Sequence, residues 1–396
     1  MLLCGTAAGS LAIPSSAQER ATETARPMRE TEPSSDVWIR HSEDPPNREV
    51  RLESLVESYI TPTERFYVRS HAKSPSIDPQ TFRLRIDGMV REPLEWSLDD
   101  LKDRFETVTV TATMTCAGNR RFEHSKTQAI SGVPWREGAI GNATWTGYRL
   151  CDVLQAAGVA ARTRHIWFNG LDEIDRGSST IAFGASIPMH KAMADGSGDG
   201  RGMPGAIVCT HMNGRPLTPD HGFPLRTVVP GYIGARSVKW LGHIHASEAE
   251  NPNHYQSTAY KVLDESTPLR WAEEAPIYRF PLNAVTCKSQ RSADGSMAIA
   301  GYALPPGQTG VTIDRVEYSV DGGHRWTAAR LIGPSDPMCW QLWRGTIASP
   351  PESGSLWVRA IDSRGRQQPD TTAWNLKGYL YNAVHRREIP PSDADG

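Results

Sequence analysis

One short segment constrains this chain more than any other, because it places a cysteine at the end of a predicted strand and two arginines just behind it. Residues 107–115 alternate β-branched and small side chains, which is typical of a buried β-strand. Cys116 follows, and Gly118 and Asn119 then allow a sharp turn, since both tolerate positive φ. The next two residues are arginines, which are expected to lower the pKa of the thiol and to offer planar cations to an oxyanion. The loop is therefore suited to hold a soft metal through sulfur and to bind an anion beside it.

Composition narrows the classes of partner. The chain has 43 Lys and Arg against 45 Asp and Glu, a formal net charge of -2. This balance argues against nucleic acid or an anionic membrane surface, which both require a basic face. No apolar run reaches the roughly 18 residues of a membrane span. Anion binding must then come from a local pocket.

The six cysteines do not form a known metal or haem motif. None belongs to a Cys-x-x-Cys pair, which disfavours zinc-ribbon, thioredoxin-like and covalent c-type haem interpretations. Cys151 and Cys209 lie among apolar neighbours and are expected to be buried in the core. Cys287 and Cys339 both lie in the C-terminal region, and the spacing leaves a disulfide between them open.

The N-terminal region is expected to lie outside the folded domains. Residues 1–18 contain an apolar stretch followed by small residues, as in an export signal, although a basic start is missing. Residues 19–45 are polar and rich in Glu, Arg, Ser and Pro, which is typical of a flexible arm. We therefore interpret 1–45 as the remnant of an export signal and an arm. A periplasmic location is the expectation, and a cytoplasmic one the alternative.

Residues 46–269 have the pattern of an α+β domain. Short strand-like runs alternate with helix-like stretches, and in 149–157 the apolar residues recur at helical spacing. A second helix is predicted over 185–194. The predicted strands are 83–87, 107–113, 164–168, 207–210 and 237–243.

Residues 270–392 have a different pattern, that of an all-β sandwich. Strands are predicted at regular intervals and are separated by Pro, Gly and Asp turns, with almost no helical periodicity. The predicted strands are 285–289, 297–303, 315–319, 341–347 and 356–362.

Five motifs in order along the chain resemble those of the sulfite oxidase family of molybdopterin enzymes. They are Phe66–His71, Cys116–Arg121, Gly132–Trp135, Phe183–Pro188, and the pair Asp220–Arg226 and Val229–Leu241. A lone Cys-Ala-Gly would be weak, whereas these matches run from about residue 60 to the C-terminus. The resemblance is to the bacterial, haem-free sulfite dehydrogenase type.

The resemblance implies a fold, a cofactor and a reaction. It implies a mixed α/β molybdopterin-binding domain followed by an immunoglobulin-like dimerisation domain. It also implies one molybdenum-pterin dithiolene per chain, without haem or flavin, and the oxidation of sulfite to sulfate. Electrons would pass to an external carrier, for which a c-type cytochrome is expected, and the chain would form a homodimer.

The resemblance also assigns roles to individual residues. Cys116 is the expected molybdenum ligand, and Arg69 and Arg121 are expected to bind the substrate oxyanion. Trp135 is expected in the wall of the substrate pocket. The residues expected to contact the pterin or its phosphate are Phe66, Tyr67, Arg69, His71, His221, Arg226, Arg236 and Lys239.

Two positions depart from the family pattern. Lys377 stands where several relatives carry an active-site arginine, so the charge is kept and the planar fork is lost. By one alignment Pro252 occupies the position of the family's catalytic tyrosine, and Tyr255 is then the nearest phenol and our candidate. His243 and His245 alternate on one strand face, but two ligands without a third do not predict a metal site.

Three other functions compete with this interpretation. A nitrate reductase shares the domain but would need haem and flavin modules. A sulfane-sulfur dehydrogenase subunit of a thiosulfate-oxidising complex shares both domains, and activity with free sulfite would distinguish it. A non-catalytic immunoglobulin-like binding protein would contain no molybdenum, and the intact segment at 116–121 argues against it.

Overall fold

The computed structural model describes residues 37–196, 205–264 and 268–389. Most of the predicted export signal and arm lies outside this range. Its last part does not, because Trp38–Ser42 forms strand β1. This strand pairs with β2 (Asn47–Val50), which pairs in turn with β3 (Val68–Arg69). The prediction of a flexible arm is therefore wrong for 38–42, which belong to a three-stranded sheet that carries Arg69.

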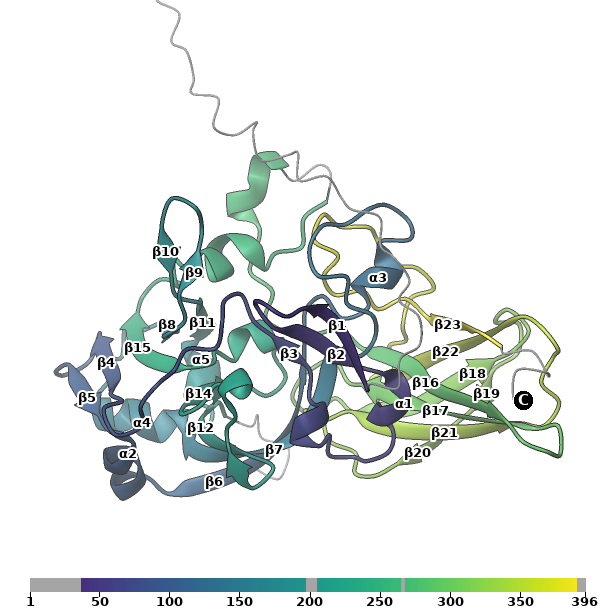
Figure 1. Ribbon diagram of the computed structural model, residues 1–396, viewed down its shortest axis with the longest axis horizontal. Coiled ribbons are helices and arrows are strands. Elements are labelled where there is room, and N and C mark those ends of the chain that lie inside the picture. The colour runs from purple at the N-terminus through teal and green to yellow at the C-terminus, as the bar shows by residue number, and fades with distance from the viewer. Residues whose placement is uncertain (1–36, 197–204, 265–267, 390–396) are drawn as a thin grey trace, which may run out of the picture. The chain divides into compact units, whose positions relative to one another are not determined.

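A five-stranded sheet forms one layer of the larger, N-terminal part of the fold (Figure 1). Its strand order is β11-β8-β15-β4-β5, and the β15–β4 pair is parallel whereas the others are antiparallel. The strands are β4 (Leu84–Gly88), β5 (Leu94–Trp96), β8 (His165–Gly170), β11 (Gly184–Pro188) and β15 (Leu241–Ser247). Helix α2 (Leu98–Arg104) follows β5 and begins at a capping box formed by Ser97 and Asp100.

A second sheet carries the cysteine loop. Its order is β13-β12-β7-β6, with β14 also paired to β12. The strands are β6 (Thr107–Thr115), β7 (Ile140–Arg149), β12 (Ile207–Met212), β13 (Arg215–Pro216) and β14 (Arg226–Val228). Helix α4 (Leu150–Ala157) follows β7 and ends at Gly158, whose φ of 66° suits glycine. Apolar residues of both sheets and of α4 share one buried core.

Short elements connect these layers. The helices are α1 (Leu52–Leu55), η1 (Thr63–Arg65), α3 (Arg121–His124), α5 (Met189–Ala192), η2 (Pro219–His221), η3 (Gly234–Arg236), the π-helix η4 (Tyr255–Ala259) and η5 (Pro268–Glu273). A small hairpin joins β9 (Ile174–Asp175) to β10 (Thr180–Ile181). None of the helices in the described residues is long and apolar enough to cross a membrane.

The C-terminal part consists of two four-stranded antiparallel sheets, as the sequence predicts for a sandwich (Figure 1). One has the order β16-β17-β21-β20 and the other β19-β18-β22-β23. The strands are β16 (Asn283–Arg291), β17 (Met297–Leu304), β18 (Ile313–Ser319), β19 (Thr327–Ala328), β20 (Arg330–Ile332), β21 (Gln341–Ile347), β22 (Ser355–Asp362) and β23 (His385–Glu388). Their inner faces meet in a core that includes Trp343, Val316 and Val358.

The predicted α+β class followed by a β-sandwich is confirmed, and two elements differ from prediction. The helix expected over 185–194 is strand β11 followed by the single turn α5, because Pro188 forces its predecessor into an extended conformation and cannot donate within a helix. The strand expected over 237–243 begins later, at Leu241, directly after Trp240, which has a positive φ of 50°.

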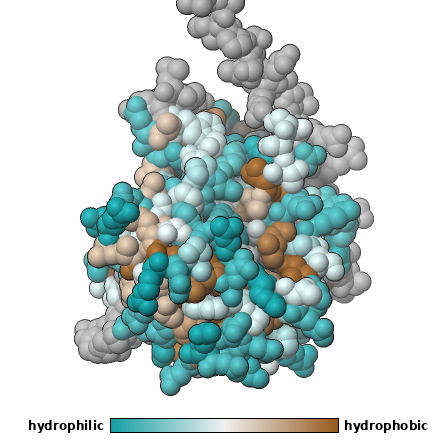
Figure 2. Space-filling model, turned by 90° about the vertical axis from the view of Figure 1, so that its left-hand side faces the viewer, coloured by the Kyte–Doolittle hydropathy of each residue, from teal (hydrophilic) through white to brown (hydrophobic). Residues whose placement is uncertain are grey.

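The face viewed in Figure 2 is mainly hydrophilic, with separate small brown areas. Among the described residues, the large hydrophobic side chains that are exposed are Leu171 and Val262. Most large apolar side chains of the described residues are therefore buried in the internal cores.

Candidate active site

Cys116 lies where strand β6 ends, in a loop held by backbone hydrogen bonds. Its N–H donates to the carbonyl of Ala139 at 2.9 Å, and its own carbonyl accepts from Asn119 N–H at 3.0 Å. The N–H of Gly118 points at the sulfur, 3.4 Å away. A Cβ at Gly118 would lie 2.7 Å from Arg121 Nη2, so a larger residue there would displace the guanidinium. The positive φ expected at Gly118 and Asn119 is found instead at Arg120, with a φ of 67°.

Burial of the Cys116 thiol outweighs the expected effect of the arginines on its pKa. Burial raises the pKa of Cys116, although Arg121 and Arg69 act in the opposite direction. The prediction of a lowered thiol pKa is therefore wrong for the protein alone, because removal of the sulfur from water raises the pKa more than the two arginines lower it.

Cys116 lies in the wall of two neighbouring cavities. The first is also lined by most of the predicted pterin contacts, namely Phe66, Tyr67, Arg69, His71, His221, Arg226 and Lys239. The second is lined by the predicted substrate residues Arg69, Arg121, Trp135 and Lys377, together with Tyr379. Cys116, Arg69 and Tyr260 line both cavities, so a ligand of this sulfur would face both.

The first cavity gathers buried cations without enough anions to neutralise them. Burial lowers the pKa of Lys239 to about 7 and that of Arg226 to about 10, and Arg226 lowers the pKa of Lys239 further. The amino group of Lys239 donates to Ser70 Oγ at 2.6 Å and to the carbonyl of Asp220 at 3.0 Å. Carboxylates of Asp172 and Asp220 also line the cavity. An anionic group bound here would offset the remaining positive charge.

His221 lines the first cavity and has a buried ring nitrogen without a hydrogen-bond partner among the described residues. Its Nδ1 is paired with the hydroxyl of Thr218 at 2.7 Å, whereas its buried Nε2 has no hydrogen-bond partner among the described residues. Burial lowers the pKa of His221 to about 3, so the ring is neutral. A buried polar atom left unpaired costs free energy, and a polar ligand in the cavity would satisfy it.

A chain of hydrogen bonds runs from Arg69 to Tyr260 beside Cys116. Arg69 Nη2 lies 3.1 Å from His71 Nδ1, and His71 Nε2 lies 3.2 Å from the hydroxyl oxygen of Tyr260. Arginine only donates, so Nδ1 must accept and the ring proton must be on Nε2. Burial and the charge of Arg69 keep the pKa of His71 well below its usual value, which favours this neutral form. His71 therefore donates to Tyr260, and the proton of Tyr260 stays available to the cavity.

Arg121 is fixed at the second cavity by two backbone carbonyls. Its Nε donates to the carbonyl of Lys377 at 2.8 Å and its Nη1 to that of Val133 at 2.7 Å. A guanidinium has five N–H donors, so these bonds set its orientation and leave others for an oxyanion. Trp135 is fully buried and forms part of the same wall.

Two predicted residues do not line either cavity. The guanidinium of Arg236 is fully buried but donates to the carbonyl of Ile277 at 2.8 Å and to the side chain of Gln256 in η4. Tyr255 packs against the ring of His71, with 4.2 Å between the ring centres, yet it does not reach the cavity lining. Both support the segment that carries Tyr260.

Tyr260 lines both cavities but is not among the residues predicted from the sequence. By one alignment Pro252 occupies the tyrosine position of the family, and Tyr255 is the phenol nearest to it in the sequence. Both phenols lie in the same loop, and no short motif distinguishes Tyr260 from Tyr255. Tyr260 directly follows the π-helix η4, which brings it back towards Cys116. Local periodicity does not predict a π-helix.

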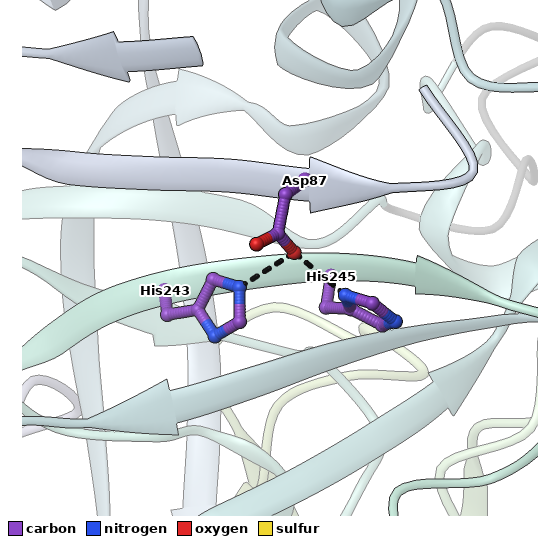
Figure 3. A group of neighbouring side chains, drawn as sticks. All are labelled: Asp87, His243 and His245. Carbon is purple, nitrogen blue, oxygen red and sulfur yellow. Dashed lines mark hydrogen bonds and ion pairs between the residues drawn. The ribbon is translucent and has the colours of Figure 1, made fainter. Parts of the chain in front are cut away.

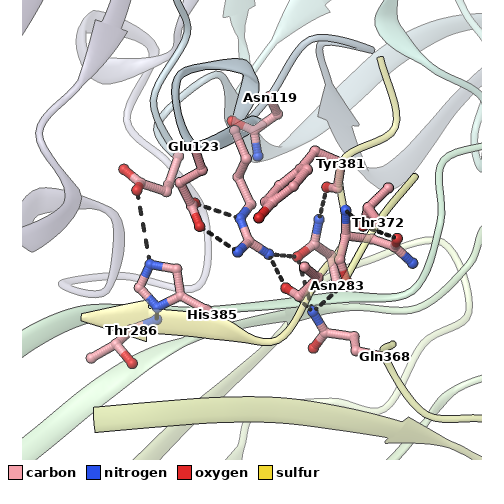
Figure 4. A network of polar contacts seen from close by, with 12 residues as sticks. Asn119, Glu123, Asn283, Thr286, Gln368, Thr372, Tyr381 and His385 are labelled. Atoms are coloured by element: carbon pink, nitrogen blue, oxygen red, sulfur yellow. Dashed lines mark hydrogen bonds and ion pairs between the residues drawn. The ribbon is translucent and has the colours of Figure 1, made fainter. Parts of the chain in front are cut away.

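A buried polar network that includes Glu123 and Asn283 ties the cysteine loop to the C-terminal sandwich (Figure 4), and Arg120 is bonded to both of these residues. Its guanidinium pairs with both carboxylate oxygens of Glu123 at 2.7 and 2.8 Å. The same side chain donates to Asn283 Oδ1 at 2.7 Å and to the carbonyl of Ala383 at 2.8 Å. Asn119 donates to the hydroxyl of Tyr302 at 3.1 Å. The sandwich therefore helps to hold the loop.

His243 and His245 do gain a third neighbour, but their hydrogen bonds oppose a metal site. Both rings donate to the same carboxylate oxygen of Asp87, at 2.8 and 2.6 Å (Figure 3). Asn169 Nδ2 donates to Nδ1 of His243 at 3.1 Å, which leaves the ring proton on Nε2, the atom that faces Asp87. Arg85 pairs with the other oxygen of Asp87. The group is satisfied as a polar cluster on the face of the sheet.

The remaining described cysteines have structural positions. Cys151, Cys209, Cys287 and Cys339 are buried and free, so the disulfide left open between Cys287 and Cys339 is not formed. Burial raises the pKa of Cys209 to about 12 and that of Cys339 to about 12, as expected for unreactive core thiols.

Comparisons with known proteins agree with this geometry. Residues 71–255 match the oxidoreductase molybdopterin binding domain, and residues 274–391 match the Mo-co oxidoreductase dimerisation domain. The chain is 40% identical to the mitochondrial sulfite oxidase of Mus musculus over 91% of its own length and 68% of that protein. It is 34% identical to the sulfite oxidase of Arabidopsis thaliana, over 87% of this chain and 92% of that one.

A solved structure is similar across both parts of the fold. The sulfane dehydrogenase SoxCD from Paracoccus pantotrophus superposes with a TM-score of 0.74 at 26% sequence identity, covering 89% of this chain and 86% of that chain. The likeness includes the arrangement of a mixed domain followed by a β-sandwich.

Proposed function

This chain belongs to the sulfite oxidase family of molybdopterin enzymes, and from this premise we propose that it oxidises sulfite to sulfate and passes the electrons to an external carrier. One observation carries the proposal: Cys116 lines both a cavity rich in buried cations and a second cavity lined by arginines. The first suits an anionic cofactor and the second a small oxyanion. The cysteine between them supplies the soft ligand that a thiophilic metal requires.

The residues of the first cavity fit a molybdopterin. Arg226 and Lys239 offer positive charge to a phosphate, the unpaired Nε2 of His221 offers a polar contact, and Phe66 closes one side. Cys116 would ligate the metal, with one pterin per chain. When bound, the molybdenum cofactor supplies the two-electron oxidation and the oxygen transfer.

The protein's own groups bind the substrate and handle its protons. Sulfite and water become sulfate, two protons and two electrons. Arg121, which is oriented by backbone carbonyls, and Arg69 bind the oxyanion, and Lys377 adds charge at the same cavity. Tyr260 accepts a hydrogen bond from His71 and directs its own proton towards the substrate oxygen or an incoming water.

Arg121 provides a direct test of the substrate cavity. Arg121→Gln removes a charge-assisted contact worth roughly 1.5–3 kcal/mol, so the KM for sulfite should rise about ten- to hundred-fold. Arg69 and Lys377 remain, so some binding survives and molybdenum content stays near that of the unmodified protein. Inhibition by the product sulfate should weaken in parallel. Steady-state kinetics with unchanged KM and unchanged sulfate inhibition would place Arg121 outside the substrate site.

We expect the chain to be a homodimer that uses its C-terminal sandwich. Residues 274–391 match a dimerisation domain, and homodimers usually bury the same surface of each subunit. Light scattering of the full chain at micromolar concentration should give about twice the mass of one chain. A single species with the mass of one chain would contradict this expectation.

The electron acceptor and the compartment are part of the proposal. A small c-type cytochrome is the expected carrier, and the apolar segment near the N-terminus supports a periplasmic location. Both can be tested by fractionating cells and by following reduction of added c-type cytochromes.

A second candidate reaction is favoured by the structural likeness to SoxCD. In that case the substrate would be sulfane sulfur on a carrier protein instead of free sulfite. Turnover with sulfite alone supports the first proposal, whereas turnover that needs a carrier-bound persulfide supports the second.

A further inference from the structure

The second cavity is also lined by the aromatic side chain of Tyr379, which has no part in the proposed reaction so far. Tyr379 lies in its wall together with Arg121 and Tyr260. Its ring stacks on that of Tyr260, with 5.2 Å between the ring centres and 19° between the planes. The guanidinium carbon of Arg121 lies 5.1 Å from the centre of the same ring. One ring therefore contacts both the proposed oxyanion ligand and the proposed proton donor.

The backbone around Tyr379 is held in place on both sides. Asn375, itself 3% exposed, accepts from Tyr379 N–H at 3.0 Å and donates to its carbonyl at 3.0 Å. The N–H of Leu380 donates to the carbonyl of Ala117 in the cysteine loop at 2.8 Å. Gly378 has a φ of 58°, and a Cβ there would lie 2.7 Å from Arg121 Cγ. The segment is thus locked against the cysteine loop, with the ring in a fixed position.

A fixed ring restricts two side chains that otherwise have freedom. Arg121 is held by carbonyls at Nε and Nη1, and the aromatic face limits the tilt of the guanidinium plane about those bonds. Tyr260 is held at its hydroxyl by His71, and stacking limits the rotation of its ring. Pre-set positions lower the entropy cost of binding and of reaching a reactive geometry.

We propose that Tyr379 is a positioning residue of the substrate cavity, whose ring aligns Arg121 and Tyr260 on the same small oxyanion. This inference rests on the proposed function, because it concerns the same cavity and the same substrate. We assign the alignment to the ring, because the stacking on Tyr260 and the approach of the guanidinium carbon of Arg121 are made through the ring. The hydroxyl of Tyr379 also interacts with Arg121, and Tyr379→Phe measures that share separately. The residue acts through its two neighbours and needs no contact with sulfite.

Three variants and a double-mutant cycle test the proposal in the molybdenum-loaded full chain. Tyr379→Phe keeps the ring and should keep the KM for sulfite within about twofold. Tyr379→Leu removes it and should raise KM about tenfold and lower kcat several-fold. Tyr381→Leu is the matched control, because the ring of Tyr381 faces the guanidinium of Arg120 at 5.0 Å and does not line the cavity. Its KM should stay unchanged even if the protein is less stable.

The cycle separates positioning from general loss of structure. If Tyr379 acts through Arg121, adding Tyr379→Leu to Arg121→Gln should raise KM by less than about twofold, because the partner is already gone. Full additivity would overturn the proposal, as would a Tyr379→Phe variant as impaired as Tyr379→Leu. If the leucine variant does not load molybdenum, Tyr379→Met takes its place in the same comparison.

Failure of this inference and failure of the proposed function give different results. If the unmodified protein loads molybdenum but does not oxidise sulfite, the proposed function fails. If it oxidises sulfite and Tyr379→Leu has the KM and kcat of the unmodified protein, the proposed function stands and only the role of Tyr379 is overturned.

Discussion

Replacing Cys116 by serine is expected to abolish sulfite oxidation while the protein stays folded. The sulfur lies between the two cavities, and a hydroxyl is a poor ligand for a thiophilic metal. Loss of even an outer partner of a metal ligand typically costs ten- to hundred-fold in activity or metal affinity, so kcat should fall by more than about a hundredfold. Circular dichroism, metal analysis and sulfite turnover on the same preparation measure the three parts of this prediction.

Cys151→Ser is the matched control for this variant. Cys151 is buried in helix α4 and lines neither cavity, so its replacement should leave sulfite turnover unchanged. Full activity in a Cys116→Ser protein that contains molybdenum would remove Cys116 from the metal site.

Replacing Tyr260 by phenylalanine is expected to give the second largest loss. The hydroxyl accepts from His71 Nε2 at 3.2 Å and Tyr260 lines both cavities, so its removal takes away a positioned hydrogen-bond donor and proton relay. Acid–base groups of this kind typically contribute about 10²–10⁴-fold, so kcat should fall by at least about a hundredfold with little change in KM. Steady-state kinetics with sulfite on molybdenum-matched samples measures both parameters.

Tyr255→Phe serves as the comparison, because Tyr255 was the candidate chosen from the sequence. Its ring packs on His71 but does not line the cavities, so its hydroxyl should matter much less than that of Tyr260. A large loss of kcat in Tyr255→Phe together with normal kcat in Tyr260→Phe would reverse this assignment.

The sequence predicts those features that depend on short segments. Strand β6, the turn after Cys116, helix α4 and the strands of the sandwich all show in local periodicity and turn residues. The cations of the first cavity lie in motifs with a recognisable order along the chain. That order leads us to expect that these cations line one cavity, and in the structure Arg226 and Lys239 both line the first cavity.

The features that were missed depend on contacts between distant segments. Arg236 and Lys239 belong to the same sequence motif, yet the guanidinium of Arg236 is turned towards Ile277 and Gln256, which no local pattern reveals. The position of Tyr260 depends on a π-helix whose Gln256 is bonded to Ser186 and Arg236. That of Tyr379 depends on the bond between the N–H of Leu380 and the carbonyl of Ala117. Local sequence propensity does not predict side-chain positions that are set by tertiary contacts.

The central claim is that the chain oxidises free sulfite with molybdenum bound at Cys116. The most direct measurement is sulfite-dependent reduction of cytochrome c by the purified full chain, with molybdenum quantified in the same samples. We predict about one molybdenum per chain and turnover that is proportional to molybdenum content, without any added carrier protein. Preparations that contain a full complement of molybdenum but do not oxidise sulfite would contradict the account.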